Sequence, residues 1–353
     1  MSFELRKLED VCDILDHIRI PITSRDRKDG PYPYYGANGI QDYIDDYIFD
    51  DDLVLLAEDG GNFGSKEKPI AYRISGKTWV NNHAHVLKPK NIIDVDYLCY
   101  SLMYYDVSGL VNGATRQKLT QSEMRKINIR YRSLEKQRQI VFKIKLVSNI
   151  ISSRKHQLCN LDLLVKSRFI EMFGDPVTNE KGWVKVRLAD KCCIITGNTP
   201  PRANEKYYGS YIEWIKSDNI TSSMYLTKAA EYLSEEGLAV GKKVESGSVL
   251  MTCIAGSLKS IGNVAIADRP VTFNQQINAV VTNEQNTLFM YEQFKLTKEY
   301  ITCDVNMALK GILSKGQLSE KQFIFPPIEL QNQFADFVAQ VDKSKFVVTA
   351  KFQ

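Results

Sequence analysis

Two histidines separated by one residue, His83 and His85, form the closest histidine pair in the chain. If this stretch is a β-strand, both imidazoles point to the same side, where they could bind a metal ion. No cysteine, aspartate or glutamate lies near the pair in the sequence, and the seven cysteines form no Cys-x-x-Cys pair. The pattern favours a structural histidine pair or a hydrogen bond to a ligand over a metal site. It predicts neither a zinc ribbon nor a disulfide framework.

Amide side chains gather at corresponding places in the two halves of the chain. Asn81-Asn82-His83 and Asn274-Gln275-Gln276 each stand beside an apolar stretch. Asn and Gln pair with the edge of adenine in the major groove of DNA, whereas Arg and Lys pair with guanine or contact phosphates. Two interpretations of each residue stay open at this point, a DNA contact or a polar strand edge or turn.

Cationic side chains in loops, or just ahead of long helical segments, extend this set of candidate DNA contacts. In the first half they are Arg25, Arg27, Lys28, Lys66, Lys68, Arg116 and Lys118, and in the second half Arg202, Lys216, Lys259, Lys310 and Lys315. An acidic run at residues 42–52 is unfavourable for a DNA-binding surface. We expect that run to face away from the groove.

The net charge of +4 is unevenly distributed. Residues 1–115 carry 12 Lys and Arg against 19 Asp and Glu, residues 116–173 carry 14 against 4, and residues 174–353 carry 20 against 19. The basic excess in the central segment has two interpretations. It is either a solvated helix face or a surface that lies near a polyanion or an acidic partner.

Length and composition indicate a soluble protein with two domains. The chain has 353 residues, of which 44% are hydrophobic and 25% charged, which is ordinary for globular proteins with substantial cores. No stretch is long and apolar enough for a membrane span, and residues 1–4 do not begin a signal peptide. A cytoplasmic protein is expected.

The segment from Leu134 to about Phe173 contains no proline and no glycine, and its apolar residues recur at steps of three, four and seven. This spacing predicts one long helix that ends at Gly174-Asp175-Pro176. An apolar stripe this narrow needs a partner helix along much of its length. Residues 331–346, with similar spacing, are the candidate partner.

The two halves repeat each other weakly. Residues 8–14 return at 188–194, and residues 134–137 return at 328–331. Each half is predicted to be an α+β unit with a mixed or antiparallel sheet. The expected strands include residues 53–57, 79–87, 249–254 and 273–281, with 79–87 half-exposed, and the expected helices are residues 94–105 and 290–300.

Four stretches resemble the specificity subunits of type I restriction-modification systems. They are YPYYGANGI at 32–40, RFIEMFGDP at 168–176, YIEWIKSDNI at 211–220 and FPPIELQ at 325–331. The resemblance implies two similar target recognition domains separated by long antiparallel coiled-coil helices in a pseudo-two-fold arrangement. On this chain it places the recognition domains at 1–130 and 177–325, the central spacer helix at 131–176 and a C-terminal spacer helix at 326–353.

The same resemblance implies a non-catalytic DNA-binding subunit of a restriction system, in which each domain reads one half of a bipartite target. The implied partners are double-stranded DNA, two methyltransferase subunits, and restriction and translocase subunits in the full complex. Neither a membrane nor a cofactor bound by this chain is expected.

The chain departs from the family pattern in two ways. Arg132-Ser133 stands where the second half has Pro326-Pro327, so the entry to the first helix is expected to be less standard. The chain also ends at Gln353, much sooner after Gln331 than the first helix ends after Gln137. The second spacer helix is therefore predicted to be short, and truncation is the simplest explanation.

Catalytic signatures are missing from the sequence. Adenine methylation uses an Asp/Asn-Pro-Pro-aromatic loop, but the double prolines here are Thr199-Pro200-Pro201-Arg202 and Phe325-Pro326-Pro327-Ile328, and no Gly-x-x-x-x-Gly-Lys-Ser/Thr phosphate loop is present. Two alternatives to a specificity subunit remain. One is the recognition part of a fused restriction-modification enzyme, and the other is a coiled-coil scaffold whose basic helix binds acidic proteins.

Overall fold

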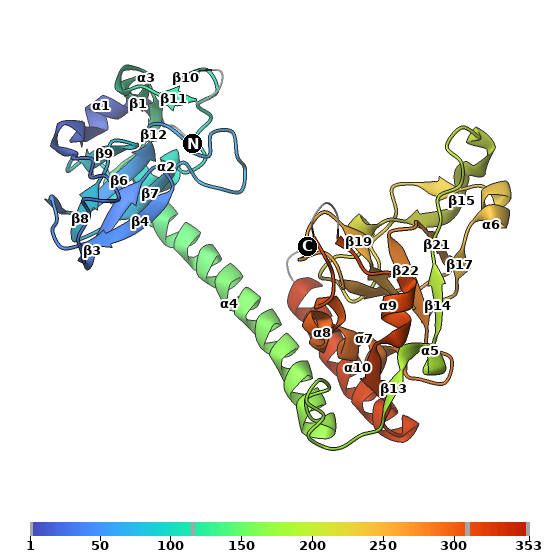
Figure 1. The fold of residues 1–353 in the computed structure, drawn as a ribbon. Coiled ribbons are helices and arrows are strands. Elements are labelled where there is room, and N and C mark those ends of the chain that lie inside the picture. The colour runs from blue at the N-terminus through green and yellow to red at the C-terminus, as the bar shows by residue number, and fades with distance from the viewer. Residues whose placement is uncertain (1–2, 114–116, 308–310, 351–353) are drawn as a thin grey trace. The chain divides into compact units, whose positions relative to one another are not determined.

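The computed structural model describes residues 3–113, 117–307 and 311–350. The chain divides into two compact units, Met1–Ser152 and Ser153–Gln353, and Figure 1 labels the elements of both. Within the described residues, no helix is long and apolar enough to cross a membrane.

The first unit is built on two four-stranded sheets. One is antiparallel, in the order β2 (Cys12–Ile14), β9 (Ala84–Pro89), β6 (Leu53–Ala57), β7 (Ala71–Ile74). The other has the order β4 (Gly39–Ile44), β3 (Asp29–Gly36), β8 (Lys77–Val80), β5 (Phe49–Asp50), and its β3–β8 pair is parallel. Every residue of β6 is buried, which explains why this strand reads as an unbroken apolar run.

Smaller elements complete this unit. Strands β1 (Glu4–Lys7) and β12 (Asn128–Tyr131) pair, as do β10 (Val111–Asn112) and β11 (Lys118–Leu119). The helices are α1 (Leu8–Val11), η1 (Asp16–Ile18), α2 (Val95–Leu102) and α3 (Gln121–Arg125). The Asp94 side chain caps α2 by accepting hydrogen bonds from the amides of Asp96 and Tyr97, so the helix expected at 94–105 is present and ends at Leu102.

The second unit has the same strand order. One sheet has the order β14 (Cys193–Thr196), β22 (Ile277–Val281), β18 (Val249–Thr252), β20 (Val264–Ile266). The other has the order β16 (Tyr232–Leu233), β15 (Tyr208–Ile215), β21 (Val271–Phe273), β17 (Lys243–Val244). The pairs β13 (Lys185–Arg187) with β24 (Gln322–Ile324) and β19 (Ile254–Ala255) with β23 (Gly311–Ile312) accompany them. The weak sequence repeat is therefore a repeat of topology, down to the parallel β15–β21 pair that matches β3–β8.

The helices of the second unit include α7 (Thr287–Leu296), the counterpart of α2. The others are α5 (Leu188–Lys191), η2 (Glu205–Tyr207), η3 (Ser217–Asn219), α6 (Glu235–Val240), α8 (Lys298–Thr302) and α9 (Lys315–Glu320). The helix expected at 290–300 is present, but it is divided at Thr297 into the end of α7 and the start of α8.

Two strand predictions also need correction. Residues 79–87 and 273–281 were each expected to form one strand, but each spans two. Residues 79–87 contain the end of β8, a turn and the start of β9, and residues 273–281 contain the end of β21, a turn and all of β22. The side-chain oxygen of Asn81 accepts a hydrogen bond from the amide of His83 (2.8 Å), and that of Asn274 accepts one from Gln276 (3.0 Å). Asparagine therefore closes both turns. The strand segments on either side are buried rather than half-exposed.

Helix α4 (Leu134–Phe173) has the predicted extent, and Gly174 follows it with a φ of 74°. It starts in the first unit and ends in the second. Within the second unit, its last turns pack against α10 (Ile328–Ala350) through the rings of Phe169 and Phe334, whose centroids lie 5.3 Å apart. Lys345 of α10 also forms an ion pair with Asp162 of α4 at 2.6 Å.

Both helices enter in the same way, so the expectation of a less standard first entry was wrong. The Gln137 side chain accepts from the amide of Asp94 (2.8 Å) and donates to the carbonyl of Arg132 (2.7 Å). Gln331 repeats these contacts with the amide of Asn286 (3.0 Å) and the carbonyl of Pro326 (2.8 Å). Both glutamines are buried. Because the contact at Arg132 and at Pro326 goes to a backbone carbonyl, the Pro-to-Arg difference leaves this contact unchanged.

Candidate nucleic-acid interface

Three loops of the first unit converge, and we call residues 37–39, 58–64 and 81–83 the first loop cluster. The Asn38 side chain donates to the carbonyl of Gly60 (2.9 Å), and Asn62 donates to the side-chain oxygen of Asn38 (3.0 Å). His83 Nδ1 lies 2.5 Å from Asp59 Oδ1. The amide turn, the glycine-rich loop and the β3–β4 hairpin tip, all far apart in the sequence, therefore form one surface.

Next to this cluster is a cavity of about 620 Å³, lined in part by Tyr35, Asn62, Lys68 and Tyr72. The rings of Tyr35 and Tyr72 lie 5.8 Å apart. Lys66 and Lys68 are exposed at the end of the glycine-rich loop. Aromatic rings beside amide and cationic groups are suited to binding nucleic acids. The rings can stack on unpaired bases, and the polar groups can form hydrogen bonds with base edges and phosphates.

The second unit has a matching surface around residues 274–276. The Gln275 side chain accepts a hydrogen bond from the hydroxyl of Thr199, and Gln276 accepts one from Ser217 (3.3 Å). Lys259 is exposed in the loop after β19, and its carbonyl accepts from Lys298 (2.7 Å). Amides and cations therefore lie at corresponding places in both units.

Not all the predicted contact residues have the same freedom to meet a ligand. Asn81 and Asn274 are 3% and 6% exposed, and their side chains are used in the turns described above. Asn82 and Gln275 are the exposed members of the two amide groups. The periodicity of the sequence did not separate these roles, because it treated each turn as the continuation of a strand.

Arg27 and Arg202 have corresponding contacts within their units. The guanidinium carbon of Arg27 lies 4.1 Å from the ring centroid of Tyr34, and Nη1 is 3.2 Å from Asp42. That of Arg202 lies 5.0 Å from the Trp214 ring, and Nη2 is 2.7 Å from Glu231. Each arginine therefore fastens its loop to the sheet by a cation–π contact and an ion pair.

Lys216 and Lys118 are also paired. Lys216 forms an ion pair with Glu231. The pKa of the Glu231 carboxyl is lowered mainly by the hydrogen bond from Lys216 and to a smaller extent by the one from Arg202. Lys118 Nζ lies 3.0 Å from Glu58.

Among the described residues, the candidates whose exposed side chains have no hydrogen bond or ion pair to another described residue are Arg25, Lys28, Lys66, Lys68, Asn82, Lys259 and Lys315. Arg116 and Lys310 lie outside the described residues.

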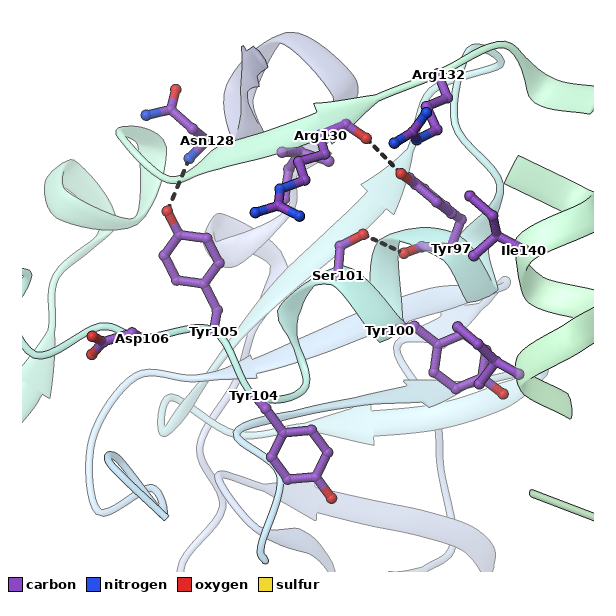
Figure 2. Close-up of a pocket in the computed structure, with 12 residues that line it drawn as sticks. Tyr97, Tyr100, Ser101, Tyr104, Tyr105, Asp106, Asn128, Arg130, Arg132 and Ile140 are labelled. Carbon is purple, nitrogen blue, oxygen red and sulfur yellow. Dashed lines mark hydrogen bonds between the residues drawn. The ribbon is translucent and has the colours of Figure 1, made fainter. Parts of the chain in front are cut away.

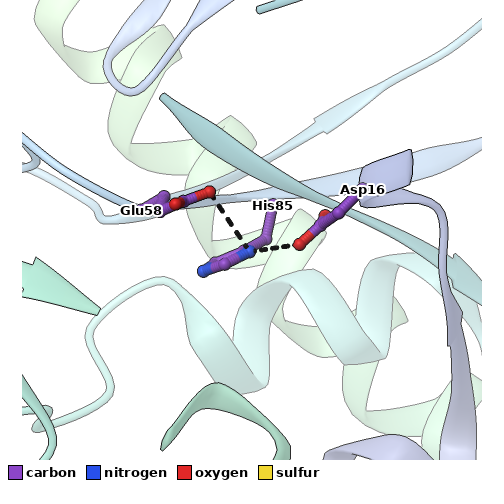
Figure 3. A group of neighbouring side chains, drawn as sticks. All are labelled: Asp16, Glu58 and His85. Carbon is purple, nitrogen blue, oxygen red and sulfur yellow. Dashed lines mark hydrogen bonds and ion pairs between the residues drawn. The ribbon is translucent and has the colours of Figure 1, made fainter. Parts of the chain in front are cut away.

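A buried polar cluster shares Glu58 with the first loop cluster and is shown in Figure 3. His85 Nδ1 is 2.6 Å from Asp16 Oδ2 and 3.7 Å from Glu58 Oε2, while Nε2 is 2.8 Å from the carbonyl oxygen of Leu119. Asp16 also accepts hydrogen bonds from the amide of Val86 (2.9 Å) and from Gln121 (3.0 Å). Burial raises the pKa of Asp16, but the hydrogen bonds from His85 and Val86 and nearby positive charge together lower it below its ordinary value.

This cluster corrects the sequence-based statement that His85 has no acidic neighbour. Asp16, Glu58 and His85 offer ligand atoms within 4.8 Å of one another, a spacing that could hold a metal ion. Arg19 Nη1 already lies 2.6 Å from Glu58, and Lys118 supplies a second cation. Because protein cations balance the carboxylates, the donor set fits an internal ion-pair network better than a metal centre.

A comparison with known families identifies the chain. A model described as the type I restriction modification DNA specificity domain matches residues 2–160 and 180–351. The chain belongs to this family. It is therefore a DNA sequence-specificity subunit of a type I restriction-modification system, the component that is not catalytic.

Individual relatives agree with this assignment. A putative type I restriction enzyme specificity subunit of Haemophilus influenzae is 26% identical over 309 residues, which are 84% of this chain and 77% of the relative. The crystal structure of a type I restriction-modification S subunit from M. genitalium has a TM-score of 0.61 at 13% identity, covering 99% of this chain and 92% of that chain. A chain from a structural study of complex assembly in the type I R-M system has a TM-score of 0.56 at 15% identity, with the same coverage. At these identities the two structures show the shared fold.

Proposed function

We propose that residues 1–130 and 177–325 are target recognition domains, each of which reads one half of a bipartite DNA sequence. The observation that carries this proposal is the identical strand order of the two units, with amide turns at corresponding places. Two copies of one reading module suit a target that consists of two separate short sequences. The DNA-contacting surface of each copy is centred on its amide turn and the loops beside it.

In this proposal the exposed candidates make direct contacts with DNA. Asn82 and Gln275 meet base edges, and Lys66, Lys68 and Lys259 meet phosphates or guanine. Asn81 and Asn274 hold the turns in shape. Arg27 and Arg202 hold the neighbouring loops, and they reach DNA only if they leave their acidic partners.

The spacer segments at 131–176 and 326–353 set the distance between the two modules. Antiparallel coiled-coil pairing of α4 with α10 would make this distance rigid, and the contacts of Phe169 with Phe334 and of Asp162 with Lys345 support such pairing. The partners of the assembled complex are double-stranded DNA, two methyltransferase subunits, and restriction and translocase subunits.

The deciding experiment is to express the full chain with a cognate methyltransferase subunit and to map the methylated sites by sequencing. We expect a bipartite consensus separated by a constant unread spacer. Asn82→Ala should relax or change one half of the consensus only, and Gln275→Ala should change only the other half. A change in both halves caused by either substitution would contradict separate reading modules.

A matched control and a spacer variant complete the test. Lys155→Ala alters an exposed side chain on α4 outside both amide turns and should leave both halves and the spacer unchanged. Deletion of residues 152–155, about one helical turn, should alter the spacer length and leave both half-sequences intact. Retention of the original spacing would argue against the helix as a ruler.

Binding of the same variants to duplex DNA at increasing salt separates phosphate from base contacts. Lys66→Ala should weaken binding to all sequences and lower the slope of log affinity against log salt by about one unit. Asn82→Ala should instead reduce the preference for the mapped sequence while leaving the salt slope unchanged.

A further inference from the structure

The guanidinium group of Arg19 contacts two of the chain segments that meet in the first loop cluster. Its Nη1 donates to the carboxylate of Glu58 (2.6 Å) and to the carbonyl of Ala84 (2.8 Å), and lies 3.5 Å from the carbonyl of Asn82. Its Nε donates to the carbonyl of Asp16 (3.0 Å). The side chain is only 12% exposed. These contacts need donors that point in several directions, which a planar guanidinium group supplies and a single ammonium group does not.

The amide turn of the first unit is held at its backbone groups. The amide of His83 donates to the Asn81 side chain, and the carbonyl of His83 accepts from the amide of Glu58 (2.9 Å). Arg19 contacts the carbonyl of Asn82 and the carbonyl of the residue that directly follows the turn. The Asn82 side chain itself is exposed. The turn is therefore fixed from the inside and displays one amide side chain to the outside.

Glu58, which Figure 3 shows beside His85, connects Arg19 to this turn. Its amide binds the carbonyl of His83, while its carboxylate accepts from Arg19 and lies 3.0 Å from Lys118. Glu58 is 9% exposed. Because little water reaches the carboxylate, hydrogen bonds to it are strong and costly to lose.

The second unit holds its amide turn without a charged pair of this kind. Thr199 follows the last residue of β14 by three positions, and its hydroxyl donates to the side chain of Gln275. The strand registers place Cys253 at the position of Glu58, and a thiol does not form such an ion pair with an arginine. The second half-site is therefore an internal control for variants of Arg19.

An amide side chain reads a base edge through two hydrogen bonds of defined direction. A displacement of about 0.5 Å, or a rotation of about 10–20°, is enough to lose this geometry. A turn that is already ordered before binding also avoids the entropy cost of ordering it on the DNA. The residue that fixes the turn therefore affects recognition without touching a base.

We infer that Arg19 is a positioning residue for the first half-site, which fixes the amide turn so that Asn82 meets its base edge in one orientation. The inference rests on the proposed function, in which Asn82 contacts a base edge. Arg19 acts through the backbone carbonyls of the turn and through Glu58. Its loss changes discrimination at the base pair that Asn82 reads and leaves the second half-site as it was.

The first test is Arg19→Lys in the full chain, expressed with a cognate methyltransferase subunit. Lysine keeps the positive charge beside Glu58, but its single ammonium group cannot also bind the carbonyls of Asp16 and Ala84. Methylation rates are measured on duplexes that carry each possible base pair at the position identified by Asn82→Ala. The preference for the cognate base pair should fall about ten-fold. Preferences in the second half-site should not change.

A double variant separates positioning from a general weakening of the unit. In an Asn82→Ala background, Arg19→Lys should cause no further loss of discrimination, because the group through which it acts is gone. A further loss of the same size would overturn the inference.

Arg73→Lys is the matched control. Arg73 forms ion pairs with Asp52 and Asp96 at 2.9 Å each, outside the first loop cluster. This variant should keep the preferences of both half-sites. Loss of discrimination equal to that of Arg19→Lys would show that any weakened ion pair in the unit has the same effect, and the inference would fail.

Hydrogen exchange of β6 and β9 checks that the first unit of each variant is folded. If Arg19→Lys lowers their protection, Glu58→Gln replaces it, since glutamine keeps the shape and the backbone amide and removes the charge that Arg19 binds. It should reduce the preference at the same base pair about three-fold, and an unchanged preference would reject the inference. If Asn82→Ala leaves the first half-site unchanged, the proposed function itself fails at this residue. If Asn82→Ala changes the half-site and Arg19→Lys does not, only the positioning role fails.

Discussion

The two units share a backbone topology but solve the same packing problem with different chemistry. Where the first unit has Asp16, Glu58 and His85, the second has Thr196, Cys253 and Asn278, which the strand registers place at equivalent positions in or directly after the strands. The Thr196 hydroxyl donates to the side-chain oxygen of Asn278 (2.7 Å). Burial raises the pKa of the Cys253 thiol to about 12, so this group stays neutral.

The charged cluster of the first unit also contacts residues outside the sheet. Arg19 joins Glu58 to the carbonyl oxygen of Ala84 (2.8 Å), and it is part of the segment that leads to Arg25 and Lys28. Lys118 pairs with the same glutamate. The network therefore links four segments that are distant in the sequence, whereas the neutral version links neighbouring strands. Equivalent topology does not require equivalent interactions, and the loops with the amide turns are supported differently in the two units.

The largest expected effect compares the packing of α4 in the second unit with its packing in the first. Phe169→Ala removes a ring that contacts Phe289, Phe334 and Phe173, and it should destabilise the second unit by about 4 kcal/mol. Ile144→Ala removes a half-buried side chain of α4 that lines a cavity beside α2 and β12 in the first unit (Figure 2). It should lower the free energy of unfolding of that unit by about 1 kcal/mol. Hydrogen exchange resolved by unit gives both values. Equal losses would show that the two joints are packed alike.

The second prediction tests the charged cluster. Asp16→Ala leaves His85 and the Val86 amide without their acceptor and should destabilise the first unit by roughly 3 kcal/mol. The matched change in the other unit, Thr196→Ala, removes one neutral hydrogen bond and should cost about 1 kcal/mol. Denaturant unfolding followed by unit-resolved hydrogen exchange measures the difference. If Thr196→Ala lowers the free energy of unfolding by the same amount, the ion network contributes no more to stability than a neutral hydrogen bond does.

The third prediction concerns the feature that the two units have in common. Gln137→Ala removes the partner of the Asp94 amide and of two backbone carbonyls. Gln331→Ala removes the partner of the Asn286 amide, of one backbone carbonyl and of the Gln285 side chain. Each substitution should cost about 2 kcal/mol in its own unit. Faster exchange of the first turns of α4 or α10 would accompany the loss. A large effect at one glutamine and none at the other would break the proposed equivalence of the joints.

The smallest expected effect is a pH dependence of opposite sign in the two units. Asp16 has a lowered pKa, so its contribution to stability is present above pH 3.8 and is lost as the pH falls through its lower folded-state value. Glu292 is 4% exposed, and burial raises its pKa although Lys295 opposes this. Its contribution is present below pH 4.5 and is lost as the pH rises through its folded-state value.

Glu292→Gln isolates this second contribution. At pH 7 the variant should be more stable than the parent by up to about 1 kcal/mol, because a desolvated charge is removed. The gain should disappear below pH 4.5, where the parent carboxyl is protonated. Thermal unfolding across this range provides the measurement, with Glu299→Gln as an exposed control. A gain that does not depend on pH would point to packing rather than charge.

Local patterns predicted some elements well and others poorly. Helix α4 followed directly from the spacing of its apolar residues and from Gly174, since both signals lie within the helix or directly after it. The amide turns were missed because apolar residues on both sides made two strands read as one. The hydrogen bond from the His83 amide to the Asn81 side chain is local, so the side-chain chemistry of asparagine was the available signal.

For the candidate site, too, some features could be predicted from the sequence and others could not. Sequence identified the amide groups and the cations, but it could not separate Asn81, which is buried, from Asn82, which is exposed. It also treated Arg27 and Arg202 as equivalent to Lys66, although each arginine lies over an aromatic ring and pairs with an acid. These partners come from other strands, so their positions depend on how the sheets assemble.

By itself, the sequence determined that this protein has two related halves joined by a long helix, because repeats and helical periodicity are written in residues close together along the chain. Only the tertiary structure decided that Asp16, Glu58 and His85 meet in one buried cluster and that Phe169 packs against Phe289 and Phe334. Contacts between residues that are far apart in the chain depend on the packing of whole strands and helices, and no local pattern encodes them.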